Sequence, residues 1–162
     1  MPHQTIALGG WLYGIGKWLP NAHHINCPVW GFTERWCRDF AASLRRPVVL
    51  IGFSEGANAA MAIAAHSPMV VRAFIHSCEN KKPSFNHNCQ YSFYVTLGDT
   101  TPTFEGTCEV AEDAASDGAT ASLSLLEYQD FENPTLFEKR FLAPRQHIFH
   151  NALPLIGLQK AA

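Results

Sequence analysis

The segment Gly52-Phe53-Ser54-Glu55-Gly56 has the residue types and spacing that best fit a chemical role. It follows an apolar, β-branched run and precedes an alanine-rich stretch, so it is expected at a sharp turn between a buried strand and a helix. Such a turn projects the Ser54 hydroxyl above the edge of a sheet and crowds the residues two positions before and after it, which favours glycine at both. The helix that follows directs its N-terminal dipole at a developing oxyanion. The pattern therefore predicts that Ser54 is a nucleophile that attacks an acyl carbonyl.

Two further stretches lead to the same interpretation. Ala7-Leu8-Gly9-Gly10-Trp11 is a short strand that ends in a tight turn, and Trp30-Gly31-Phe32-Thr33 opens a helical stretch that runs toward the Ser54 turn. Together with that turn, these stretches resemble the α/β-hydrolase superfamily over most of the chain. The resemblance implies a three-layer α/β/α sandwich with a mostly parallel sheet of about five to six strands. It also implies a single domain over residues 1–162 that acts as a serine hydrolase.

The family order of catalytic residues is nucleophile, then acid, then histidine. On this resemblance Asp99 is the predicted acid, because it lies in a Gly-Asp turn just after a strand. Glu79 and Asp117 are weaker candidates for the same role. His147 is the predicted base, since the family has an apolar residue two positions after its histidine, and His150 is the alternative.

The same resemblance assigns the remaining parts of the site. The backbone N–H groups of Glu55 and Trp11 are expected to bind the oxyanion, and Gly10, Leu12 and Phe53 are expected to contact the substrate. We assign no metal and no cofactor. His76 falls within an expected strand, which favours a core role for its side chain.

Alternating apolar and amphipathic runs predict parallel strands joined by crossover helices. Thr33 is a candidate N-cap for a helix that runs through Arg45. The interval between the fourth and fifth expected strands, Cys78 to Gln90, is too short and polar for a helical cap, so we expect an open site. Expected strands cover residues 5–8, 23–30, 47–51, 70–77, 91–97 and 121–128, expected helices cover 33–45, 57–66 and 109–116, and the tail from Asn133 is expected to be helical in pieces.

Composition narrows the class of partner. The 162 residues are 47% hydrophobic and 16% charged with a formal net charge of −2, which fits a folded domain without a basic surface for nucleic acid. No apolar run is long enough to span a bilayer, and no signal peptide is apparent, so a cytoplasmic location is expected. The five cysteines are odd in number and none forms a C-x-x-C pair, which favours free thiols.

The function that these features predict is hydrolysis of a carboxylic ester or thioester, on a small molecule or an acyl carrier, through an acyl-enzyme on Ser54. An inactive binding module with the same fold is the main alternative, because a fold does not guarantee activity. An acyltransferase that uses the same triad is a third hypothesis. The sequence does not indicate the oligomeric state.

Overall fold

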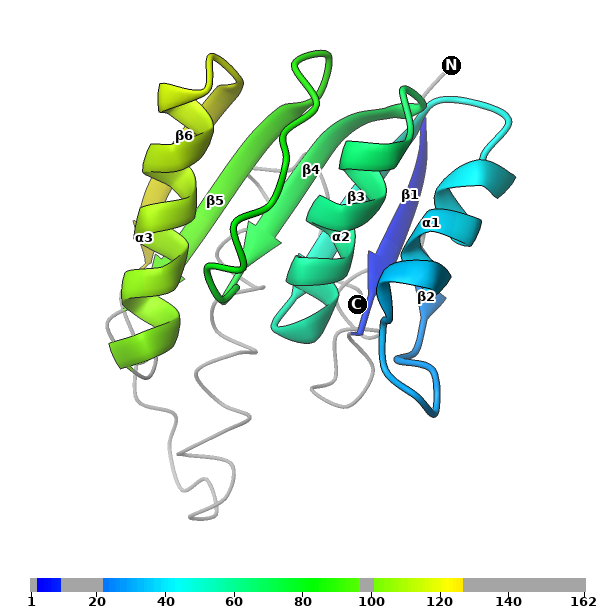
Figure 1. Cartoon of the computed structure of the whole chain (residues 1–162), viewed down its shortest axis with the longest axis horizontal. Helices are drawn as coiled ribbons and strands as arrows, with labels where there is room; N and C mark the ends of the chain where they lie inside the picture. Colours follow the sequence, from blue (N-terminus) through cyan, green and yellow to red (C-terminus); the bar gives the residue numbers. More distant parts are fainter. Residues whose placement is uncertain (1–2, 10–21, 97–100, 127–162) are drawn as a thin grey trace, which may run out of the picture.

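The computed structural model describes residues 3–9, 22–96 and 101–126, and these residues form one six-stranded sheet with helices packed on it (Figure 1). All neighbouring strands run parallel, in the order β2-β1-β3-β4-β5-β6. The strands are β1 (Gln4–Leu8), β2 (His23–Ile25), β3 (Val48–Phe53), β4 (Val70–His76), β5 (Gln90–Thr96) and β6 (Thr120–Leu126), and the helices are α1 (Glu34–Ser43), α2 (Glu55–His66) and α3 (Thr101–Ser116).

Helices α1, α2 and α3 lie on one face of the sheet, with α2 over its centre (Figure 1). Leu50 and Ile51 are consecutive in the central strand β3, so their side chains point to opposite faces, and both are buried. Both faces of the centre are therefore covered, as expected for a parallel sheet. The predicted α/β class and the parallel sheet of five to six strands are confirmed. The second helical layer of the expected three-layer sandwich lies outside the described residues.

Helices α1 and α2 are stabilised by residues that lie close together in the sequence. Thr33 caps α1, and its hydroxyl accepts a hydrogen bond from the N–H of Trp36 at 3.1 Å, as predicted. Helix α2 presents alanine to the sheet, and Ala57, Ala60 and Ala64 have no exposed surface. These small side chains let the helix approach β3 and β4 closely, which holds the turn before α2 in place.

Two predicted boundaries are wrong. The strand expected over residues 23–30 ends at Ile25, because the chain turns at Pro28, whose carbonyl accepts a hydrogen bond from the N–H of Gly31 at 2.8 Å. The helix expected over 109–116 begins at Thr101. Its early part contains Gly106, where a Cβ would come within 3.0 Å of the backbone N of Asn80.

Helix α3 is attached to the chain that follows β4. The Thr107 hydroxyl accepts a hydrogen bond from the Cys78 N–H and donates one to the Cys78 carbonyl, both at 3.1 Å. Glycine and threonine are poor helix formers in isolation, so it is packing that extends the helix through them. The predicted end of this helix at residue 116 is confirmed. Gly118 follows with a φ of +89°, and its N–H donates to the Ala115 carbonyl at 3.1 Å.

The connection from β4 to β5, residues 77–89, contains neither helix nor strand. The Asn86 side chain holds it down by donating to the carbonyls of Ala64 and Ser67, both at 3.1 Å. The backbone N–H of Asn86 also donates to the Tyr91 hydroxyl at 2.9 Å. The expectation that this interval is a loop is confirmed. Among the described helices, none has the length and apolar character needed to cross a bilayer.

Candidate active site

Ser54 lies between the end of β3 and the start of α2, in a backbone conformation that few residues adopt. Its φ is 59° and its ψ is −116°. A non-glycine residue in this region is strained by about 1–3 kcal/mol, and such strain persists only where the surroundings impose it. Here the Ser54 N–H donates to the His76 carbonyl of β4 at 2.9 Å, and the Ser54 carbonyl accepts from the Ala57 N–H at 3.0 Å.

The two glycines around Ser54 lie in the crowded positions that the sequence predicts. A Cβ on Gly52 would come closer than 3.0 Å to backbone atoms of Gly56 and Ala57, and a Cβ on Gly56 would do the same with Leu8. Real Cβ atoms do not approach backbone this closely, so both positions require glycine. The strand–turn–helix geometry expected around Ser54 is therefore present.

The side chains next to the turn are buried. Phe53 stacks on the His76 ring with ring centroids 5.0 Å apart, and both side chains are buried. Nδ1 of His76 lies 2.9 Å from the Ser77 hydroxyl. His76 is thus a core residue, as expected, while contact of Phe53 with a substrate stays a prediction.

The direction of the strands determines which acidic candidates lie at the same edge of the sheet as Ser54. Because all strands run parallel, the carboxyl ends of β3, β4 and β5 lie at the same edge (Figure 1). Glu79 follows β4 at that edge, with its exposed carboxylate 3.9 Å from Nζ of Lys81. Asp99 lies three residues beyond the end of β5 and is outside the described residues.

Asp117 is wrong as an alternative acid. It follows α3 and precedes β6, which puts it at the amino ends of the strands, on the edge opposite Ser54. Its carboxylate lies 2.8 Å from Nε2 of His87, another residue at that edge. Asp117 directly follows the end of a helix, whereas the acid of the predicted triad is expected after the carboxyl end of a strand.

The remaining predicted site residues fall outside the described ranges. They are Gly10, Trp11, Leu12, Asp99 and both histidine candidates, His147 and His150. Their roles stay predictions. Within the described residues, no group of three or more histidine, cysteine, aspartate or glutamate side chains is placed to hold a metal ion.

A hollow of about 210 Å³ opens beside Glu55, the residue that follows Ser54. It is lined by Glu55 and Asn58 of α2, by Lys81 of the β4–β5 connection, and by the segment before α1, residues 30–33. The Glu55 carboxylate accepts a hydrogen bond from the Cys27 thiol at 3.4 Å, so this side chain is directed toward Cys27. Burial, together with this carboxylate, raises the pKa of Cys27 above its usual value.

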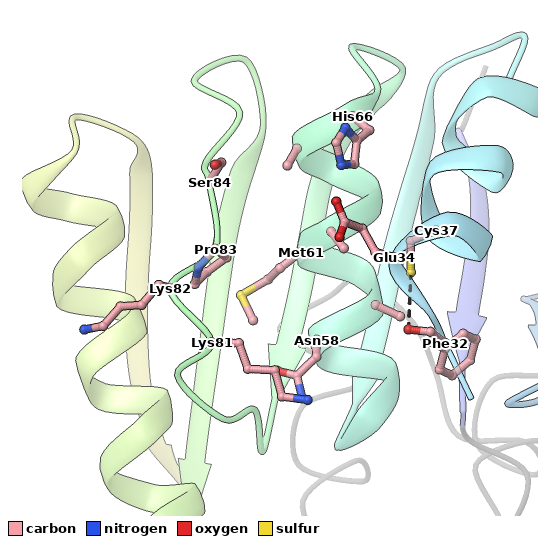
Figure 2. A pocket seen from close by; sticks show the side chains of 13 residues that line it. Phe32, Glu34, Cys37, Asn58, Met61, His66, Lys81, Lys82, Pro83 and Ser84 are labelled. Carbon is pink, nitrogen blue, oxygen red and sulfur yellow. Dashed lines mark hydrogen bonds between the residues drawn. The ribbon is translucent and has the colours of Figure 1, made fainter. Parts of the chain in front are cut away.

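A longer groove of about 640 Å³ continues along the outer face of α2, from Asn58 to His66 (Figure 2). Helix α1 and the segment 81–84 form its two walls, and Met61 and Ala62 lie on its floor. It shares Phe32, Asn58 and Lys81 with the smaller hollow, so the two spaces are adjacent. The sequence analysis missed both spaces, because each is formed by segments that are far apart in the sequence.

Comparisons with known proteins support the fold. No protein-family model and no curated protein sequence matches the chain. Among solved structures, esterase PE8 is similar with a TM-score of 0.58 and 14% identity, over 90% of this chain and 92% of that one. A carboxylesterase of Bacillus cereus is similar with a TM-score of 0.51 and 15% identity, over 90% and 87% of the two chains.

A third structure, MGS-M1, is an α/β hydrolase enzyme from a Medee basin deep-sea metagenome library. Its TM-score is 0.50 at 10% identity, over 77% of this chain and 68% of that one. Identities this low show the fold alone. With the parallel sheet and the strained Ser54 turn between β3 and α2, these similarities show that the chain has an α/β-hydrolase-like fold.

Proposed function

We propose that this protein is a serine hydrolase that cleaves a carboxylic ester or thioester through an acyl-enzyme on Ser54. The observation that carries the proposal is the backbone of Ser54. A serine held at φ 59° between two glycines that admit no Cβ costs stability, and its side chain makes no capping hydrogen bond to α2. Strain of this kind clusters at functional sites, and the esterases among the similar structures favour hydrolysis.

The mechanism assigns one task to each predicted residue. His147 removes the proton from the Ser54 hydroxyl, whose oxygen then attacks the acyl carbon. Asp99 holds the imidazole in the required tautomer and stabilises its charged form. The N–H groups of Glu55 and Trp11 bind the oxyanion, and each such donor is worth about 3 kcal/mol of transition-state stabilisation.

The acyl carbon then loses its alkoxide or thiolate, which takes the proton from His147. A water molecule, deprotonated by the same imidazole, attacks the acyl-enzyme and releases the carboxylate product and free Ser54. The α2 dipole favours the oxyanion in both steps, because Ser54 immediately precedes the helix N-terminus.

A fluorophosphonate probe and p-nitrophenyl acetate test the proposal. We expect the probe to label the wild type and not Ser54→Ala, and hydrolysis to fall by several orders of magnitude in that variant. Folding of the variant is checked by circular dichroism and urea unfolding. An unlabelled, inactive wild type would favour the inactive binding module, and activity that survives Ser54→Ala would place the chemistry elsewhere.

The base is tested by a matched pair of substitutions. His147→Ala should abolish hydrolysis, while His150→Ala should retain it, since the resemblance assigns the base to His147. The reverse result would assign His150 as the base. An acyltransferase would be recognised by transfer of the acetyl group to an added alcohol or amine at the expense of hydrolysis.

A further inference from the structure

The hollow beside Glu55 has the size and the lining of a binding site for part of a substrate. Its volume of about 210 Å³ lies below the roughly 300 Å³ of a site for a whole drug-sized ligand. It can therefore hold one ring rather than a complete molecule. Its position at the first turn of α2 places that ring next to the residue that follows the proposed nucleophile.

Trp30 gives this hollow an aromatic surface. The residue is 89% exposed, although tryptophan is usually among the most buried side chains on average. It lies in the turn closed by the hydrogen bond from the Gly31 N–H to the Pro28 carbonyl, so its backbone is fixed. A solvent-exposed indole on a hydrogen-bonded turn offers a platform for the flat face of a ring, because tryptophan has only two side-chain torsions to order on binding.

The polar groups of the hollow include both signs of charge and both kinds of hydrogen-bonding atom. Glu55 supplies a carboxylate and Lys81 an ammonium. In the described part of the chain, Oδ1 of Asn58 is buried and has no hydrogen-bond partner, which leaves an acceptor in need of a donor. An isolated ion would be attracted by one charge and repelled by the other, whereas a neutral ring with several hydroxyl groups can satisfy all three side chains.

The adjacent groove along α2 adds space for further rings linked to the first one. It leads from Asn58 to His66, and polar side chains such as Lys82 and Ser84 lie along one wall above an apolar floor. Figure 2 shows the lining residues of the groove spread along α2 from Asn58 to His66. This shape suits an elongated occupant built from repeated rings.

We propose that the hollow and the groove bind an acylated oligosaccharide, with one sugar ring stacked on Trp30 and hydrogen-bonded to Asn58, Glu55 and Lys81. This inference rests on the proposed function, which supplies the hydrolysis. The acyl C–O bond to a sugar oxygen breaks, that oxygen takes the proton from the catalytic imidazole, and water then converts the acyl group to a carboxylate. The free sugar hydroxyl and the carboxylate are the products.

Kinetics on matched esters test the proposal. The substrates are a methyl xyloside carrying a single acetyl group, cyclohexyl acetate as a ring without hydroxyls, and vinyl acetate as an ester without a ring. Trp30→Ala should lower kcat/KM for the xyloside relative to vinyl acetate by about tenfold, and Trp30→Phe should restore most of it. Asn58→Ala should lower the ratio of kcat/KM for the xyloside to kcat/KM for cyclohexyl acetate by about tenfold. Val29→Ala is the control, because Val29 is 94% exposed in the same turn and lies outside both spaces.

A binding measurement that needs no catalysis separates the two proposals. Saturation-transfer NMR with unacylated xylotetraose is run on the Ser54→Ala protein, with and without Trp30→Ala. Binding that depends on Trp30 would support the sugar site even if no ester were cleaved, in which case only the hydrolase proposal would fail. Hydrolysis of p-nitrophenyl acetate without xylotetraose binding and without any preference for the xyloside would overturn the sugar site and leave the hydrolase proposal standing.

Discussion

The Cα of Gly56 lies against the carbonyl group of Leu8, so that a Cβ on Gly56 would come closer than 3.0 Å to both the carbonyl carbon and oxygen. This contact joins the first turn of α2 to the end of β1. It fixes the distance between the Ser54 turn and the neighbouring strand end, after which the predicted oxyanion donor Trp11 follows in sequence.

Gly56→Ala should therefore lower the free energy of unfolding by about 3 kcal/mol, because backbone atoms must move to admit the methyl group. Gly31→Ala is the matched control. Its φ is +80°, but no atom lies within 4 Å of a Cβ at that position, so only conformational strain of about 1 kcal/mol is expected. Urea unfolding of both variants measures the difference, and equal losses would refute the steric account of Gly56.

Ser54→Gly should be more stable than Ser54→Ala by about 1 kcal/mol, because glycine adopts a φ of 59° without the strain that a Cβ causes there. Both variants should lack esterase activity. Urea midpoints at constant m-value provide the measurement. If Ser54→Ala matched or exceeded Ser54→Gly, the backbone at this position would not be strained, and the structural support for the nucleophile would be lost.

The acid is tested by three substitutions at different places in the fold. Asp99→Asn should lower kcat roughly ten-thousandfold, because the amide favours the wrong imidazole tautomer. Asp117→Asn should leave kcat unchanged, since Asp117 lies at the opposite edge of the sheet beside His87. Glu79→Gln tests the remaining candidate for the acid. A large loss of kcat in that variant, without a loss in Asp99→Asn, would assign the acid to Glu79.

Buried thiols make the fold sensitive to alkali. Burial raises the pKa of Cys37 and Cys78 from 9.0 to about 11, and that of Cys89 from 9.0 to about 12. Their contribution to stability is complete below pH 9.0, where both states are protonated, and is lost as the pH rises toward 11 to 12, since the unfolded chain loses the protons first. Urea unfolding between pH 7 and 11 should show this fall, and Cys89→Ala should make it shallower. A slope that is the same in Cys89→Ala and wild type would contradict the role of Cys89.

The centre of the fold could be predicted from the sequence because its signals are local. The β-branched run before Ser54, the two glycines around it and the alanines after it specify strand, turn and helix within about twenty residues, and the structure agrees with each. The start of α3 could not be predicted, because Gly106 resembles a helix breaker until its packing against Asn80 is known.

The candidate site was predictable only in part. The turn that presents Ser54 follows from residue spacing, and the predicted helix over 109–116 already indicated that Asp117 precedes a strand. The exposure of Trp30 was beyond the sequence, since a tryptophan beside a strand is more often buried. Such features depend on contacts between distant segments, which residue types do not encode.

The position of the Ser54 oxygen is set by main-chain atoms, through the N–H bonded to the His76 carbonyl and the glycine packed on Leu8. The side chains of Trp30 and Lys81, which line the hollow, take no part in these two contacts. Mutations that change the ligand preference can therefore accumulate at positions such as Trp30 and Lys81 without disturbing the attacking atom. A scaffold of this kind can change what it binds while it keeps the same backbone geometry at the proposed nucleophile.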